Sequence, residues 1–163
     1  MELRDDVEAN LAQMQERSPS GFAIGLHLAF TTSKYIIQTY PKPWMEEYSK
    51  RGFLLSDPTV RWGLENTGFI RWSVLKEQDE GGVIDAAAEF GLNFGVSIAI
   101  AQSGSRSLGS FASPTAEFDD AVISDLTKAL ENLHIATQRI EPASSDDALI
   151  QRIVASFTSV EPN

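Results

Sequence analysis

The chain has 163 residues, of which 42% are hydrophobic and 22% charged, as in an ordinary globular domain. Its formal net charge is −10, and its 13 basic residues are scattered, which disfavours nucleic-acid binding because phosphates require clustered Lys and Arg. The chain has no cysteine, only two histidines and no apolar run near the ~18 residues of a membrane span. We therefore expect no disulfide, no metal site and no membrane segment. Because the charged N-terminus lacks a signal-peptide core, we predict a cytoplasmic location.

The chain begins with a predicted amphipathic helix over residues 2–16, followed by a strand. In "FAIGLHLAF" (22–30) bulky residues alternate with Ala, Gly or His, which is typical of a strand with one bulky and one small-residue face. A turn at 31–33 leads to its predicted hairpin partner, residues 34–39. His27 falls on the small-residue face, where we interpret it as a packed or edge histidine rather than a ligand.

Two short helices are predicted next. The first runs from Pro43 to about Arg51 and ends at Gly52, since proline favours helix starts and glycine favours helix ends. The second begins at Pro58, with Asp57 as its N-cap.

The second half of the chain is predicted to add strands and a long helix. The segments are an extended stretch at 68–72, a helical turn and loop at 73–82, a helix from 83 to about 91, hairpin strands at 95–102 and 107–113, an apolar-striped helix at 115–140, a linker-like stretch at 141–147 and a last short helix.

This order of elements predicts an α+β fold in a single domain, residues 1–163. We expect a three-layer α/β/α sandwich with a central antiparallel sheet of about five strands. Such an arrangement can hold a cavity between the sheet and one helical layer.

Motifs for catalysis are weak. There is no G-x-S-x-G elbow, and the carboxylate pairs Asp119–Asp120 and Asp146–Asp147 stand at predicted helix starts, where acidic residues favour the helix dipole. We therefore predict that the protein is not an enzyme.

The stretch "YPKPWMEEYSKRGFLLSDPTVRW" (40–62) concentrates aromatic residues around one carboxylate. Trp44 and Tyr48 stand four apart and share a helix face, with Tyr40 before them and Asp57 after them. Such a cluster fits either a packed core or a mostly apolar pocket with a few polar anchors.

The full pattern resembles a known family. Its spacing, Tyr-x3-Trp-x3-Tyr-x8-Asp-Pro, is similar to that of the autoinducer-binding domain of LuxR-type quorum-sensing regulators, and the resemblance covers about residues 3–160. The motif consists of Tyr40-Pro41, Trp44, Tyr48, Gly52, Asp57-Pro58, Val60 and Trp72, with looser support from "FGLNFGVSIAI" (90–100) and "LGSFA" (108–112).

The resemblance implies an N-acyl-homoserine lactone as ligand, and no other cofactor. It implies that Trp44 donates to the lactone carbonyl, Asp57 accepts from the ligand amide, and Tyr40 donates to the acyl carbonyl. The further implied contacts are Tyr48 and Trp72 as walls, Val60 as lining, Thr59 as an extra hydroxyl, and Leu26, Ile36, Leu92 and Phe111 along the acyl chain. Trp62 lies outside the motif and is predicted to pack.

Two departures from the family stand out. Many members carry Ser or Thr where this chain has Ala112, and residues 141–163 hold no helix-turn-helix domain. We therefore expect either a ligand-binding domain separated from its DNA-binding half or a regulator that lacks one.

The sequence supports three hypotheses about function. The first is a sensory domain that couples lactone binding to folding and dimerisation, with helix 115–140 as either dimer surface or core. The second is a DNA-binding-deficient protein that forms inactive heterodimers with full-length regulators. The third is the same fold binding a different small apolar ligand.

Overall fold

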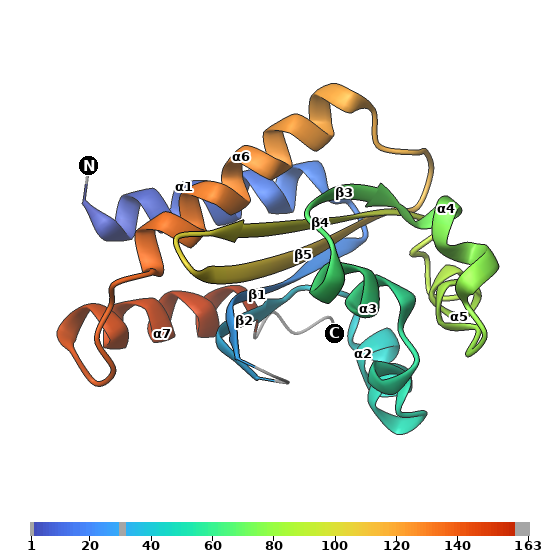
Figure 1. The fold of residues 1–163 in the computed structure, drawn as a ribbon, viewed down its shortest axis with the longest axis horizontal. Coiled ribbons are helices and arrows are strands. Elements are labelled where there is room, and N and C mark those ends of the chain that lie inside the picture. The colour runs from blue at the N-terminus through green and yellow to red at the C-terminus, as the bar shows by residue number, and fades with distance from the viewer. Residues whose placement is uncertain (1, 30–31, 159–163) are drawn as a thin grey trace.

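The computed structural model describes residues 2–29 and 32–158, which form one five-stranded sheet with helices on both faces (Figure 1). All strand pairs are antiparallel, in the order β2-β1-β5-β4-β3. The strands are β1 (Gly21–Ala29), β2 (Thr32–Gln38), β3 (Gly68–Arg71), β4 (Phe94–Gln102) and β5 (Ser105–Ser113). The helices are α1 (Leu3–Arg17), α2 (Lys42–Lys50), α3 (Pro58–Glu65), α4 (Trp72–Leu75), α5 (Val83–Ala88), α6 (Asp120–Thr137) and α7 (Ser145–Thr158), with short 3-10 helices at Phe53–Leu55 and Lys76–Gln78. The predicted α+β fold is confirmed. Phe30, at the end of the predicted strand, and Thr31, in the predicted turn, lie outside the described residues.

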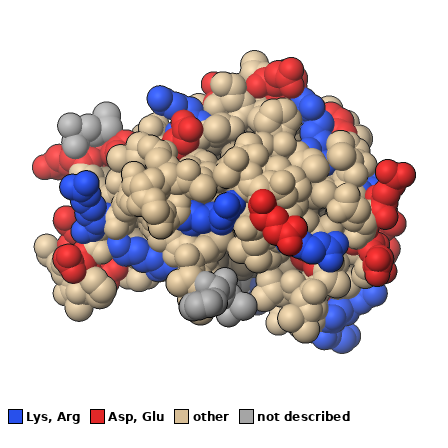
Figure 2. Space-filling model, in the orientation of Figure 1, with Lys and Arg blue, Asp and Glu red and all other residues tan. Residues whose placement is uncertain are grey.

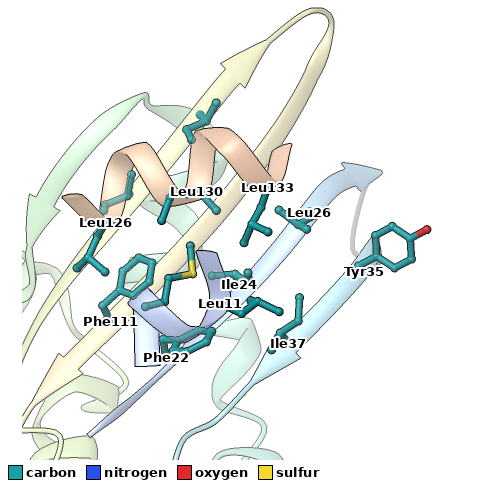
Figure 3. Packing of buried hydrophobic residues seen from close by; sticks show 14 of the residues in the cluster. Leu11, Phe22, Ile24, Leu26, Tyr35, Ile37, Phe111, Leu126, Leu130 and Leu133 are labelled. Carbon is teal, nitrogen blue, oxygen red and sulfur yellow. The ribbon is translucent and has the colours of Figure 1, made fainter. Parts of the chain in front are cut away.

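One face of the sheet carries the main hydrophobic core. Helices α1 and α6 cover this face, and Figure 3 shows Leu126, Leu130 and Leu133 of α6 beside bulky residues of β1 and β5. Phe22 and Phe111 pair across β1 and β5 and stack with ring centroids 5.9 Å apart. Burial of such side chains contributes about 1.5–3 kcal/mol each, so this layer holds the sheet in place.

Helix α6 is shorter than the predicted 115–140 because its N-cap is fixed farther along. The side chain of Asp119 accepts from the backbone N–H of Val122 over 2.9 Å, which starts the helix at Asp120. The apolar stripe of α6 faces the core, while Ile135 remains 57% exposed. The stripe that we considered as a dimer surface is therefore core.

Helix α7 packs on β2 and α1 and is longer than the short helix predicted. Tyr35 of β2 donates to Oδ1 of Asp147 over 2.6 Å, and Ile150 and Ile153 enter the core. Nearby, the ammonium of Lys34 donates to the carbonyl of Thr137 at the end of α6. Strand β2 is thus tied to both C-terminal helices.

His27 does not keep to the small-residue face of β1, contrary to our prediction. Its backbone has a φ of +59°, in the left-handed region, and the side chain turns toward α6 instead. There Nε2 donates to the carbonyl of His134 over 3.0 Å, while Nδ1 lies 2.6 Å from Oγ of Ser105. His27 is therefore a packed, hydrogen-bonded histidine, as its interpretation as a non-ligand implied.

Charge is dispersed over the surface. On the face shown in Figure 2, basic and acidic side chains are interspersed and form no continuous basic stripe. Across residues 2–29 and 32–158, no helix has the length and apolarity to cross a bilayer.

Candidate ligand-binding site

Helices α2 and α3 position the aromatic cluster beside the second face of the sheet. Helix α2 ends before Gly52, whose φ of +64° requires the left-handed conformation that glycine adopts freely. The chain then turns through Phe53–Leu55 and enters α3 at Pro58, with Asp57 as N-cap. The predicted Asp-Pro helix start is confirmed.

A cavity of about 860 Å³ lies between these helices and the small-residue face of the sheet. Ala23 and Gly25 of β1 line it on the sheet side, where the absence of bulky side chains leaves room. Its opening carries exposed leucines, of which Leu55 is 94% exposed. The cavity is large enough for a small amphipathic molecule and has a mostly apolar wall.

Asp57 is the one carboxylate buried in this cluster, at 8% exposure. Its Oδ1 accepts from both the backbone N–H and the hydroxyl of Thr59, at 2.9 and 2.7 Å, and its Oδ2 accepts from the hydroxyl of Tyr48 at 2.8 Å. Burial raises the pKa of Asp57, and the hydrogen bonds from Thr59 and Tyr48 oppose that rise. Because each carboxylate oxygen has two lone pairs, Oδ2 retains capacity for one more donor.

Trp44 provides a hydrogen-bond donor that complements the acceptor on Asp57. It is 3% exposed and is enclosed by the rings of Tyr48, Phe53 and Phe90, whose centroids lie 5.5–5.8 Å from its own. Its indole N–H makes no hydrogen bond to the described part of the chain, and the side chain lines the cavity. The nitrogen is not one of the fully enclosed atoms that lack a partner, so its N–H is accessible and can donate to a ligand in the cavity.

Tyr40 differs from Trp44 in that its proton already has an acceptor. The hydroxyl donates to the backbone carbonyl of Ser110 in β5 over 3.1 Å. Burial, with the nearby charge of Asp57 as a smaller cause, raises the pKa of Tyr40. Donation to a ligand would require the hydroxyl to exchange one acceptor for another.

Trp72 forms a wall of the cavity against β4. A Cβ on Gly95 would lie only 2.0 Å from the Trp72 ring, so the indole lies directly on the glycine backbone. Its N–H donates to Oγ of Ser97 over 3.1 Å, and that oxygen lies 2.6 Å from Oγ of Ser110. The glycine is needed here for close approach, since no side chain fits beneath the indole.

The structure brings eight of the eleven predicted site residues to the cavity and leaves three elsewhere. Leu26 and Phe111 lie on the opposite face, in the core under α1 and α6. Leu26 shares its strand parity with the bulky residues of β1, and Phe111 pairs with Phe22 on that same face. Leu92 packs in the cluster behind Trp44 and Trp72 without lining the cavity. The eight residues at the cavity are Tyr40, Trp44, Tyr48, Asp57, Thr59, Val60, Trp72 and Ile36.

Other residues that line the cavity were not predicted from the sequence. Ser110 and Leu108 alternate with Phe111 along β5, so the strand period was a signal that could have found them. Leu54 and Leu55, and the buried α5 residues that line the cavity, had no such signal, because only the tertiary fold brings them to this point. Trp62 is partly buried against the same cluster and does not line the cavity, which fits its predicted packing role. No group of three or more His, Asp or Glu side chains among the described residues is placed to hold a metal ion.

A protein-family model covers most of the chain, and two transcriptional activators match parts of it. The family model described as "Autoinducer binding domain" matches residues 21–140. The transcriptional activator SolR of Ralstonia nicotianae is 44% identical over 61 residues, which are 37% of this chain and 26% of SolR. VanR of Vibrio anguillarum, also a transcriptional activator, is 32% identical over 72 residues, 43% of this chain and 30% of VanR. The matched stretches thus span under a third of these relatives.

Solved structures share the fold at lower identity. Escherichia coli SdiA superposes with a TM-score of 0.63 at 20% identity, covering 96% of this chain and 73% of that one. CepR2 of Burkholderia cenocepacia, described as an N-acylhomoserine lactone-dependent LuxR family transcription factor, gives 0.55 at 17% identity, covering 85% and 95%. Because the family model spans most of the chain and includes the whole cavity motif, the chain belongs to the autoinducer-binding domain family of LuxR-type, quorum-sensing transcriptional regulators.

Proposed function

We propose that the cavity binds an N-acyl-homoserine lactone, and that the chain is the sensory domain of a quorum-sensing regulator. The observation that carries the proposal is the pairing, in one apolar cavity, of a Trp44 N–H that donates to no described protein group with a spare acceptor position on Asp57. A lactone head with a carbonyl oxygen and an amide N–H supplies the two missing partners.

Each polar group of such a ligand has a counterpart. The indole of Trp44 donates to the lactone carbonyl, and Oδ2 of Asp57 accepts the amide proton in a charge-assisted bond of about 1.5–3 kcal/mol. Tyr40 can turn its hydroxyl toward the acyl carbonyl, at the expense of its bond to Ser110. The acyl chain then lies on the small-residue face of β1 and gains about 0.8 kcal/mol per buried CH₂.

A binding experiment tests this. The purified chain is screened against lactones of several acyl lengths by thermal shift, and protein from a lactone-producing host is analysed by mass spectrometry for a co-purified ligand. We expect a rise in melting temperature that is lost in Asp57→Asn and Trp44→Phe. Trp62→Phe is the matched control, because Trp62 is outside the cavity and its substitution leaves the shift intact. A screen in which no lactone shifts the wild type refutes the proposal.

An acylglycerol is a second candidate ligand. SdiA, whose fold this chain shares at 18% identity and a TM-score of 0.63, has been solved with octanoyl-rac-glycerol. A glycerol hydroxyl can also donate to Asp57, but such a ligand lacks the amide. Competition decides between the two: the lactone displaces the glyceride if the amide is recognised, and the reverse order favours the glyceride.

Five points stay predictions: dimerisation, coupling of ligand binding to folding, pairing with full-length regulators, a cytoplasmic location and the absence of catalysis. Since the apolar stripe of α6 is core, a dimer must use other surfaces. Light scattering of the chain with and without lactone tests dimerisation, and a pull-down with a co-expressed full-length regulator tests heterodimers. A lactone recovered unchanged after long incubation is the result expected of a receptor.

A further inference from the structure

Ser110 places a hydroxyl at the cavity that the head-group anchors do not use. It stands on β5 between the buried core residues Gly109 and Phe111, on the face where Leu108 also lines the cavity. The carbonyl of the same residue accepts the Tyr40 hydroxyl, so Ser110 is adjacent to the polar end of the site.

The direction of the Ser110 proton follows from its neighbours. The Trp72 indole can only donate, and it donates to Oγ of Ser97. Ser97 is fully buried, and the remaining partner of its hydroxyl is Oγ of Ser110 at 2.6 Å, so the Ser97 proton points at Ser110. Ser110 thus accepts from Ser97, and its own proton is left without a protein partner among the described residues.

The consequence is a hydroxyl proton at the cavity that no described protein group accepts. The chain of bonds runs from Trp72 through Ser97 to Ser110, and each member fixes the polarity of the next. Apart from Ser97, the side chains around Ser110 on the sheet are Leu108 and Ala23, which offer no acceptor. A plain methylene chain lying here would leave the Ser110 proton unpaired, at the cost of a desolvated donor.

We propose that Ser110 is a specificity-determining residue that selects acyl chains carrying an oxygen acceptor, such as a keto group, close to the amide. This inference rests on the proposed lactone-binding function and adds to it the chemical class of the ligand's acyl chain. The position near the amide follows from Tyr40, whose hydroxyl contacts the Ser110 carbonyl and is the group that we propose donates to the acyl carbonyl.

The test compares matched ligands. Affinities of wild type, Ser110→Ala, Ser110→Thr and Ser33→Ala are measured by calorimetry for 3-oxoacyl and unsubstituted acyl homoserine lactones of equal length. Ser33→Ala is the matched control, because Ser33 also lines the cavity, at the β2 side. Circular dichroism melts of the unliganded variants report whether each one folds.

We expect the wild type to prefer the 3-oxo ligand by about 2–12-fold, the range of one neutral hydrogen bond. Ser110→Ala removes this preference by weakening the 3-oxo ligand alone, Ser110→Thr keeps it, and Ser33→Ala leaves it unchanged. Equal binding of both ligands to wild type and Ser110→Ala overturns the inference and leaves lactone binding standing. Failure of both ligands to bind wild type overturns the proposed function as well.

Discussion

The hydroxyl of Tyr48 donates to Oδ2 of Asp57 over 2.8 Å, so a residue of α2 fixes the carboxylate that begins α3. Asp57 therefore has two tasks. Its Oδ1 caps the helix through Thr59, and its Oδ2 stays available at the cavity. The same arrangement gives Tyr48 a positioning role beyond that of an aromatic wall.

Tyr48→Phe removes this hydrogen bond and keeps the ring. Because the bond lowers the pKa of Asp57 against the effect of burial, its loss raises that pKa further. The ionised form accepts the ligand amide best, so lactone affinity falls as pH drops through the pKa of Asp57. We expect about 3–10-fold weaker binding at pH 7 and a pH dependence displaced upward, both measured by calorimetry from pH 5 to 8.

Asp57→Asn is the control for that pH profile. An amide does not titrate, so binding becomes weaker and independent of pH in this range. A pH dependence that persists in Asp57→Asn assigns the titration to another group.

Trp44→Phe and Tyr40→Phe should differ in cost. Trp44 gains a partner on binding, whereas Tyr40 exchanges the Ser110 carbonyl for one on the ligand. We expect at least about 10-fold weaker binding for Trp44→Phe and less than about 3-fold for Tyr40→Phe, because Trp44 adds a hydrogen bond on binding whereas Tyr40 loses one bond for each bond it gains. Equal losses in a titration would show that the Tyr40 bond to Ser110 is not retained in the free protein.

Gly25→Ala should shorten the acyl-chain part of the cavity. A Cβ at this position would lie 2.7 Å from Oγ of Ser33, a side chain that can rotate away, so the fold tolerates it. The added methyl group occupies space on the small-residue face of β1. We expect long-chain lactones to lose affinity relative to short-chain ones, as measured by thermal shift across a length series. An equal loss of affinity for lactones of all lengths would place the acyl chain in another part of the cavity.

His27 should make stability depend on pH. Burial, with smaller effects from His134 and Lys34, lowers its pKa from 6.5 to about 4. The unfolded chain therefore takes up a proton between pH 6.5 and 4 that the folded chain refuses, and the stabilisation present above pH 6.5 is lost across that window. Because the side chain is partly exposed, we expect a loss of about 1–2 kcal/mol in the free energy of unfolding.

His27→Asn provides the comparison, since asparagine tolerates the positive φ and does not titrate. Urea melts at pH 7.5 should show the variant to be less stable, because it loses bonds to Ser105 and Thr137. The gap should narrow toward pH 4. A constant gap would assign the pH dependence to other groups.

Local pattern predicted most of the fold. The hairpins, the Asp57 cap and the helices on both faces follow from strand alternation, Pro and Gly positions and helical spacing. The errors arose where tertiary contacts decide. His27 leaves its strand face because α6 offers hydrogen-bond partners, and α6 starts late because Asp119 caps it.

The candidate site was also predicted only in part. The anchors came from the spacing of a family motif, and the structure brings them to one cavity. The acyl-chain contacts that the resemblance implied were less accurate, because Leu26 and Phe111 lie on the other face of the sheet, in the core. The Trp72–Ser97–Ser110 series joins three separate strands or helices, and no sequence spacing encodes such a contact.

The most direct test of the central claim is a nuclear magnetic resonance titration that follows the indole N–H signals of Trp44, Trp62 and Trp72, assigned by single Trp→Phe variants. On addition of the lactone, we predict a downfield shift of the Trp44 signal as its free donor gains a carbonyl acceptor, while the Trp62 signal stays in place. A lactone that binds and leaves the Trp44 signal unmoved would contradict the proposed hydrogen bond from Trp44 to the ligand.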